Sequence, residues 1–271
     1  MLGAIIGDII GSPYERHNIK TVDFPLFSGR SRFTDDTVLT AALAEGLMDG
    51  FGDEVKTEAC VKSSMLKFGR RYPKAGYGSH FKRWLLSPDA ETCDSFGNGA
   101  AMRVSPAGWI FSDLEATEKY AAISARVSHG HPEGIKGASS VAGAIFLART
   151  AKDKAVIKKY VEGKYGYDLS RRIDDIRPVY AFDSSCQGSV PEAIIAFLES
   201  DGFEDTIRKA VSIGGDSDTI AAIAGSVAEA FWGIPEDIKH ESLERLDTVI
   251  LSVIERWEIF LYGLRRDKFN N

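Results

Sequence analysis

Apolar positions recur at steps of three and four residues along most of the chain, which is the period of an amphipathic α-helix. One such stripe follows Asp216-Ser217-Asp218-Thr219 and stops near Gly233 and Pro235, residues that commonly end a helix. A second begins at Val38, and the longest runs over residues 243–261. The same period predicts helices over residues 55–68, 115–127, 133–149 and 204–213.

Three segments depart from a simple helical stripe. Ser189 and Glu192 have the spacing of a capping box, and Pro191 is tolerated in a first turn, so a helix is expected to begin there. The Lys-rich residues 152–168 are expected to form a solvated surface hairpin, and only residues 177–183 suggest an extended piece. We therefore predict an all-α fold, with residues 1–271 forming a single domain.

Glycines occupy every fourth position of the first predicted helix, at Gly3, Gly7 and Gly11. This spacing lets another backbone approach closely, and in a chain of this composition it favours tight helix packing over a membrane dimer. The segment is interrupted by Asp8, lacks a basic region and is too short to span a bilayer. No membrane partner is indicated.

Composition and charge exclude some classes of partner. The formal net charge is −6 and the Lys and Arg residues are scattered, so there is no electrostatic footprint for a nucleic-acid backbone. Cys60, Cys93 and Cys186 are far apart with no CxxC pair, which favours neither a disulfide framework nor a thiolate metal site. A reducing, cytoplasmic location is expected.

Two acidic clusters, each directly before an apolar helix, are the strongest chemical signal: Thr34-Asp35-Asp36-Thr37 and Asp216-Ser217-Asp218-Thr219. N-capping accounts for one acid per helix, because a carboxylate there accepts hydrogen bonds from first-turn amides. It does not account for two, because neighbouring carboxylates repel and burial raises the pKa of at least one unless a cation is present. The doubling favours a metal site.

The donor types indicate which metal. Carboxylates and hydroxyls, with no Cys or His adjoining either cluster, suit Mg²⁺, Mn²⁺ or Ca²⁺ better than structural zinc. Four acids could hold two ions about 3.5–4 Å apart, the spacing of two-metal hydrolytic sites. Asp35 and Asp36 are then expected within ligand distance of the same cations as Asp216 and Asp218.

A glycine-containing loop is a candidate substrate site. The stretch SFGNGAAMR, residues 95–103, sets Gly97 and Gly99 around Asn98 before a small-residue helix. Its amides could hold a phosphate or diphosphate, although an ordinary Asn-Gly turn has the same sequence.

Two further stretches carry side chains with catalytic or binding potential. SHGHPEG, residues 128–134, brings His129 and His131 together, either as a substrate contact or as a plain surface loop. Glu15 is expected in a turn after the first helix, where an ordinary surface acid is the default interpretation.

Five motifs in this order resemble the ADP-ribosylglycohydrolase family: GDIIGSPYE, RFTDDT, FGNGAAMRVSP, SHGHPEGIKGA and IGGDSDTIAAIAGSVAEAFWGIP. They cover the chain from about residue 3 to about residue 235, and the pairing of TDDT with GGDSDT is the most specific part. The resemblance implies a compact, orthogonal multi-helix bundle with a binuclear Mg²⁺ or Mn²⁺ centre at the bottom of a cleft.

The resemblance also implies an activity, namely hydrolysis of the bond at the anomeric carbon of the distal ribose in ADP-ribosylated proteins or small ADP-ribose conjugates. Glu15 would lie close to the metals, as a ligand or as the group that positions or deprotonates the attacking water, with Asp36 also catalytic. The metal ligands would be Thr34, Asp35, Asp36, Asp216, Asp218 and Thr219. The substrate-binding residues would be Phe96, Gly97, Asn98, Gly99 and His129.

Two alternatives remain open at this point. One is a non-catalytic ADP-ribose binder, as in a crystallin lineage that resembles the same family. The other is a Mg²⁺-dependent phosphohydrolase that uses Asp216-Ser217-Asp218-Thr219 as an aspartyl nucleophile motif, which expects a preceding β-strand near the start of an α/β fold. The leaving group, whether arginine, serine, a base or an acetyl ester, is not selected by any motif.

Overall fold

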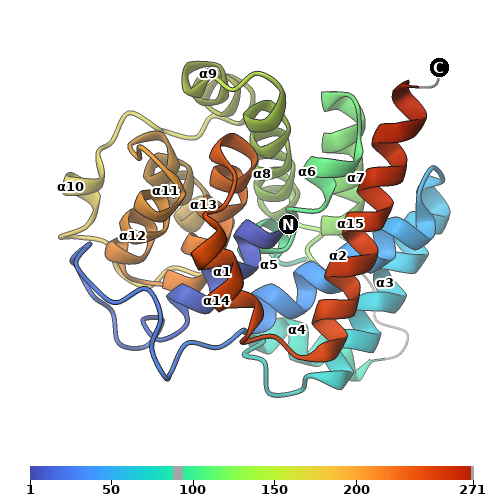
Figure 1. Ribbon diagram of the computed structural model, residues 1–271, viewed down its shortest axis with the longest axis horizontal. Coiled ribbons are helices and arrows are strands. Elements are labelled where there is room, and N and C mark those ends of the chain that lie inside the picture. Colours follow the sequence, from blue (N-terminus) through green and yellow to red (C-terminus); the bar gives the residue numbers. More distant parts are fainter. Residues whose placement is uncertain (88–93, 270–271) are drawn as a thin grey trace.

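The computed structural model describes residues 1–87 and 94–269, and within them the chain is helical with no strand (Figure 1). This confirms the all-α prediction. The helices are α1 Leu2–Gly11, α2 Asp35–Gly50, α3 Glu54–Arg71, α4 Ser79–Leu86, α5 Gly99–Met102, α6 Ala107–Ile110, α7 Leu114–Arg126, α8 Pro132–Thr150, α9 Lys154–Tyr165, α10 Ile173–Ile176, α11 Cys186–Leu198, α12 Phe203–Ile213, α13 Ser217–Trp232, α14 Glu236–Leu243 and α15 Thr248–Phe269.

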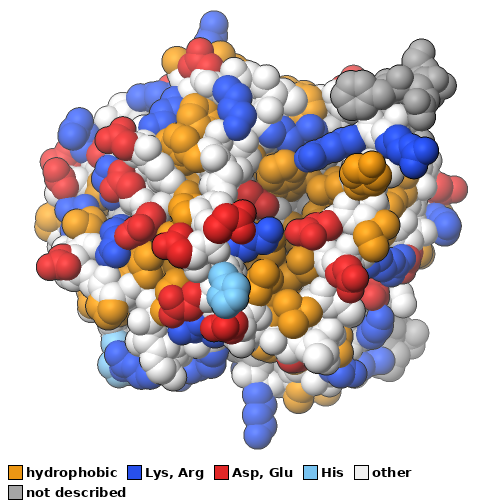
Figure 2. Space-filling model, in the orientation of Figure 1, with side chains coloured by type: hydrophobic (Ala, Val, Ile, Leu, Met, Phe, Trp, Pro, Cys, Tyr) orange, Lys and Arg blue, Asp and Glu red, His pale blue; other side chains and the backbone are white. Residues whose placement is uncertain are grey.

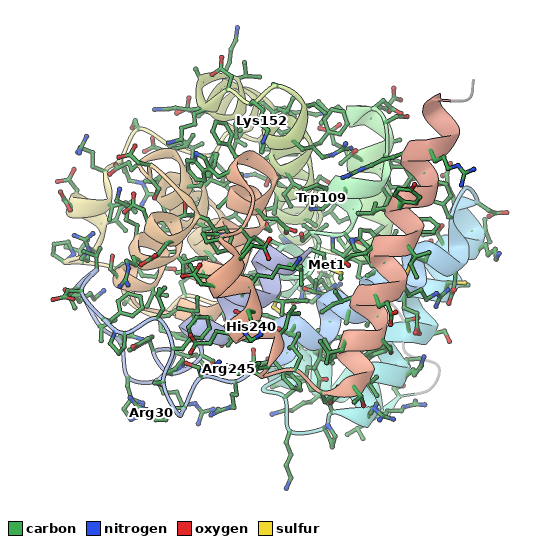
Figure 3. All side chains as sticks on the ribbon, viewed as in Figure 1. Met1, Arg30, Trp109, Lys152, His240 and Arg245 are labelled. Carbon is green, nitrogen blue, oxygen red and sulfur yellow. The ribbon has the colours of Figure 1, made fainter. Side chains whose placement is uncertain are left out.

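Helices α1 and α13 pack against each other at the centre of the molecule. Every residue of α1 is buried, and Met1, which precedes it, lies in the middle of the view in Figure 3. Helix α13 also contacts α8, α11 and α12, while α1 contacts α2. Because α13 is apolar on most of its circumference, it can be surrounded in this way. The packing brings the first turns of α2 and α13 to the same region.

The glycines of α1 allow this contact. A Cβ atom on Gly3 would lie 2.2 Å from the carbonyl oxygen of Gly225, and one on Gly7 would lie 2.1 Å from that of Ala221. At Gly11 it would lie 2.5 Å from the Cα of Asp218. All three distances are far inside van der Waals contact. The prediction of tight helix packing is therefore confirmed, and the partner is α13.

Residues 152–168 contain a helix, α9, and the hairpin expected from their polarity is wrong. Asp153 caps α9 by accepting hydrogen bonds from the amides of Ala155 and Val156, at 2.7 and 3.4 Å. Figure 3 labels Lys152, where the chain passes from α8 to α9. Only Ile157 and Val161 of α9 are buried, so the apolar stripe in the sequence is narrow.

Helix α11 begins earlier than the expected capping box. Ser185 is the N-cap residue. The Ser189 hydroxyl instead donates to the carbonyl oxygen of Asp183 at 3.0 Å, and Glu192 forms an ion pair with Arg171 at 2.7 Å. The predicted capping box does not form, because the side chains of Ser189 and Glu192 both have tertiary partners.

Residues 177–183 form a turn followed by an irregular segment, so the expected extended piece is not a strand. The chain that follows makes one isolated antiparallel bridge, between Gly97 and Ser185. Beside it the amide of Asn98 donates to the carbonyl oxygen of Ser184 at 2.8 Å. This bridge attaches the loop before α5 to the start of α11.

The surface carries both signs of charge. On the face shown in Figure 2, acidic and basic side chains are interspersed, as expected from their scatter along the sequence. Across the described residues, none of the helices combines the length and the apolar character needed to cross a membrane.

Candidate metal centre and active site

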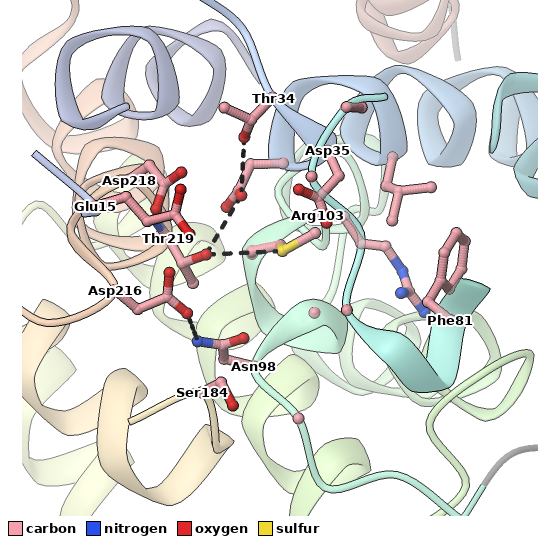
Figure 4. A pocket seen from close by; sticks show the side chains of 18 of the residues that line it. Glu15, Thr34, Asp35, Phe81, Asn98, Arg103, Ser184, Asp216, Asp218 and Thr219 are labelled. Atoms are coloured by element: carbon pink, nitrogen blue, oxygen red, sulfur yellow. Dashed lines mark hydrogen bonds between the residues drawn. The ribbon is translucent and has the colours of Figure 1, made fainter. Parts of the chain in front are cut away.

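The first turns of α2 and α13 meet at a cavity of about 510 Å³ (Figure 4). The hydroxyl of Thr219 in α13 donates to the carboxylate of Asp36 in α2 at 3.3 Å, although 183 residues separate them in sequence. The structure thus brings the two acidic clusters together. All six predicted ligand residues line this cavity: Thr34, Asp35, Asp36, Asp216, Asp218 and Thr219.

A further acid, Asp8 of α1, lies against the two clusters and was not predicted. Asp8, Asp36 and Asp218 each have a carboxylate oxygen within 4.8 Å of the other two. Asp8 is fully buried, and every other residue of α1 is apolar or glycine. A lone acid in such a helix is the signal that could have identified it, because a buried carboxylate requires polar partners.

Asp8 caps helix α2 from outside that helix. Its Oδ2 accepts hydrogen bonds from the amides of Thr34 and Thr37 at 2.8 and 3.1 Å, and from the Thr37 hydroxyl at 2.5 Å. Its Oδ1 accepts from the Thr34 hydroxyl at 2.7 Å. The N-cap residue Thr34 makes no side-chain capping bond of its own. The expectation that one acid of the Asp35-Asp36 pair is a cap is therefore wrong.

Burial and mutual repulsion raise the pKa values of the clustered carboxyl groups. Desolvation is the largest cause at each; it raises the pKa of Asp8 to about 6 and, with repulsion from Asp8, that of Asp35 to about 8. The pKa values of Asp36 and Asp218 lie well above their usual range for the same two reasons. Such a group of acids is stabilised in its charged form by a cation.

One atom of the cluster has no partner within the protein. Oδ1 of Asp36 is buried and makes no hydrogen bond to the described residues. Buried carboxylate oxygens are normally satisfied, and a metal ion supplies such a partner. The residues present therefore fit a hard divalent cation bound by oxygen.

Asn98 connects the loop of residues 95–99 to the second acidic cluster (Figure 4). Its side-chain amide donates to Oδ2 of Asp216 at 2.7 Å and to the hydroxyl of Ser189 at 3.0 Å. Burial raises the pKa of Asp216 above its usual value, and the bond from Asn98 partly opposes this rise. Asn98 therefore orients a candidate metal ligand.

The same loop forms part of the cavity wall through Gly97 and Gly99. Two of its amides already have partners, since that of Gly97 donates to the Ser95 hydroxyl at 3.2 Å and that of Asn98 donates to Ser184. A phosphate in the cavity cannot use those two amides without breaking these bonds.

Of the two ring-bearing residues predicted to bind the substrate, His129 and Phe96, only His129 lines the cavity. His129 is buried and lines the cavity. Phe96 is 50% exposed and is not among the lining residues; its ring lies edge-on to that of His131, with 5.5 Å between centroids. His131 caps α8 by accepting from the amide of Glu133 at 3.1 Å.

Glu15 lies in the turn after α1, as predicted, and lines the cavity near Asp218 (Figure 4). Its charge contributes to the raised pKa of Asp218. The cavity is also lined by three exposed cations that make no ion pair within the described part of the chain: Arg16, Arg32 and Lys74. The buried acids suit a metal ion, and the exposed Arg and Lys side chains suit an anionic ligand in the same cavity.

The ADP-ribosylglycohydrolase family model matches residues 1–269. The chain belongs to this family. ADP-ribosylhydrolase ARH3 of Homo sapiens is 26% identical over 87% of this chain and 85% of that protein. ADP-ribosyl-dinitrogen reductase glycohydrolase of Rhodospirillum rubrum is 25% identical over 94% of this chain and 91% of that protein. A solved ADP-ribosylglycohydrolase-related protein complex matches with a TM-score of 0.69 and 25% identity, covering 98% of this chain and 95% of that one.

Membership of the ADP-ribosylglycohydrolase family supports a general activity, the hydrolysis of ADP-ribose conjugates. The phosphohydrolase alternative expects a strand before residues 216–219. Instead, helix α12 precedes them, and the described residues contain no strand.

Proposed function

We propose that this protein is a metal-dependent hydrolase that cleaves the bond at the anomeric carbon of the distal ribose in ADP-ribosylated proteins or small ADP-ribose conjugates. The observation that carries the proposal is the convergence of both acidic clusters on one cavity. A protein that only binds ADP-ribose would not need buried acids with an unpartnered Asp36 oxygen. Because this site takes residues from Asp8 to Thr219, we further propose that residues 1–271 form one domain.

Two Mg²⁺ or Mn²⁺ ions would occupy the site. When bound, they supply Lewis-acid chemistry, lowering the pKa of water and polarising sugar hydroxyls. Asp8 supports this centre as a cap, because its hydrogen bonds hold Thr34 and the first turn of α2 in place. The proposed ligands are Thr34, Asp35, Asp36, Asp216, Asp218 and Thr219.

Other groups of the chain act on the substrate directly. Glu15 positions the attacking water and accepts its proton. The carboxylate of Asp36 provides negative charge that stabilises the positive charge on the ribose as the leaving group departs. The wall formed by Gly97, Gly99 and His129 binds the ADP-ribose, and the exposed ring of Phe96, next to Gly97 in sequence, contacts the same ligand.

The substitution Asp36→Asn tests the metal centre. We expect ADP-ribose release to fall at least about 100-fold, and Mg²⁺ affinity measured by calorimetry to fall about 10- to 100-fold, because a charged ligand is lost. Asp175→Asn in α10 is the matched control, since Asp175 is exposed and its side chain has no partner among the described residues; both properties should stay unchanged. Wild-type activity and Mg²⁺ affinity in Asp36→Asn would overturn the proposal.

A substrate panel separates the enzyme from the ADP-ribose binder. ADP-ribose linked to arginine, serine, a base or an acetyl ester is incubated with Mg²⁺, with Mn²⁺ and with EDTA. We expect release from at least one linkage and its loss in EDTA. Calorimetric binding of ADP-ribose without release from any linkage would instead identify a non-catalytic binder.

A further inference from the structure

His129 occupies a confined position between the cavity and a turn. It follows the C-terminus of α7, and its backbone amide donates to the carbonyl oxygen of Ala125 at 2.7 Å. The Nε2 side of the ring faces the loop of residues 95–99: a Cβ added to Gly99 would lie 3.0 Å from Nε2, and one added to Gly97 would lie 3.5 Å away. Gly97, Gly99 and His129 all line the cavity, and a side chain at either glycine would crowd Nε2.

The opposite ring nitrogen, Nδ1, faces two polar groups. The hydroxyl of Ser128 lies 2.8 Å from it, and Nη1 of Arg103 lies 3.5 Å from it. Arg103 is fully buried, and no carboxylate pairs with it within the described residues. Nη2 of Arg103 donates to the Ser128 hydroxyl at 2.8 Å and to the carbonyl oxygen of Ser124 at 3.2 Å.

These contacts determine where the imidazole proton resides. A guanidinium group only donates, so the Ser128 hydroxyl accepts from Arg103 and has its own hydrogen available for Nδ1. A hydrogen on Nδ1 would point at the guanidinium and leave the Ser128 hydrogen without an acceptor. Burial, followed by repulsion from Arg103 and His80, also lowers the pKa of His129 well below its usual value. With the neutral ring protonated on Nε2, the Ser128 hydroxyl accepts from Arg103 and donates to Nδ1, so both of these groups have partners.

We propose that Arg103 and Ser128 are positioning residues that hold His129 as the neutral Nε2–H tautomer, so that it donates a hydrogen bond into the cavity. The identity of the acceptor rests on the proposed function: Nε2–H of His129 then donates a hydrogen bond to an oxygen of the ADP-ribose. The tautomer itself does not depend on that function. His129 is a fixed donor in this arrangement, and it does not deliver a proton to the leaving group.

The tautomer is measured by NMR on protein with ¹⁵N-labelled histidine. The signals of the His129 ring are assigned as those that disappear in His129→Asn. We expect a protonated Nε2, an unprotonated Nδ1 and no titration between about pH 5.5 and 8. A ring protonated on Nδ1, or one that becomes charged in this range, would overturn the proposal whatever the enzyme does.

Ser128→Ala tests the positioning role of Ser128. Ser124→Ala is its control because, among the described residues, the Ser124 hydroxyl bonds only to the carbonyl oxygen of Ala121. We expect Ser128→Ala to shift the Nδ1 signal of His129 and to weaken ADP-ribose binding about two- to tenfold, the effect of one hydrogen bond. Ser124→Ala should leave both at their wild-type values. Identical spectra and affinities in the two variants would contradict the role of Ser128.

Arg103→Met tests the donor to Ser128. Without the guanidinium, the Ser128 hydroxyl is free to accept a hydrogen from Nδ1, so we expect the Nδ1–H tautomer of His129 to become populated. A folded variant whose His129 stays entirely in the Nε2–H tautomer would contradict the role of Arg103. If the wild type shows the Nε2–H tautomer but neither binds nor hydrolyses any ADP-ribose compound, the proposed function fails and the tautomer assignment stands.

Discussion

Asp8 and the Asp35-Asp36 pair divide two tasks at the start of α2. Asp8 satisfies the first-turn amides, so neither acid of the pair is used as a cap and both can face the cavity. The sequence predicts a special role for Asp35 and Asp36 because two adjacent acids before an apolar helix can be seen in the sequence itself. It could not predict the role of Asp8, because the partners Thr34 and Thr37 belong to another helix.

Asp8→Asn should destabilise the protein by about 2–4 kcal/mol, because an amide accepts fewer hydrogen bonds and turns its own donors toward the buried amides of α2. Urea unfolding monitored by circular dichroism measures this. The control is Asp53→Asn, at an exposed N-cap of α3. It should change the free energy of unfolding by less than about 0.5 kcal/mol, since aspartate and asparagine are both good N-cap residues. Equal effects at the two positions would show that Asp8 is an ordinary cap.

Among the helices, the long apolar stripes predicted α2, α3, α7, α8, α12, α13 and α15. The errors came where tertiary contacts decide the outcome. The narrow stripe of α9 buries only Ile157 and Val161, and the apparent capping box of α11 is used for contacts with Asp183 and Arg171. The glycine spacing of α1 predicted a close contact but not its partner, because spacing within one helix carries no information about the other.

Gly7→Ala should separate α1 from α13, because its Cβ would lie 2.1 Å from a carbonyl oxygen of the central helix. We expect a loss of at least about 2 kcal/mol in unfolding free energy and weaker Mg²⁺ binding, since α13 carries Asp218. Gly163→Ala in α9 is the control: nothing lies within 4 Å of the new Cβ, and the helix should gain up to about 1 kcal/mol. A wild-type melting curve for Gly7→Ala would contradict the close packing.

For the whole molecule, the buried acids couple folding to pH and, through the proposed metal centre, to metal concentration. An aspartate whose pKa is raised in the folded state contributes stability that is present below its ordinary pKa and is lost as the pH rises toward the folded value. For Asp35 this window runs from the ordinary value of 3.8 to about 8. Metal ions compete with protons for the same oxygens, so they should matter most at the alkaline end.

The melting temperature in EDTA should therefore fall between about pH 6 and 8, and the increase on adding Mg²⁺ should grow over the same range. Differential scanning calorimetry at several pH values, with and without Mg²⁺, measures both. Asp35→Asn should flatten the dependence because it removes one of the raised groups. A Mg²⁺ effect of the same size at pH 6 and pH 8 would show that the acids are not the binding groups.

The central packing of α1 on α13 has a consequence for biosynthesis. Helix α1 leaves the ribosome before α13, with no polar face to present to water, and its partner α13 is made only after α2 to α12. Until then its apolar surface is unprotected, so the nascent protein is a candidate client for chaperones that hold unfolded chains. The proposed metal centre is likewise incomplete until Thr219 has emerged, because its two halves come from α2 and α13.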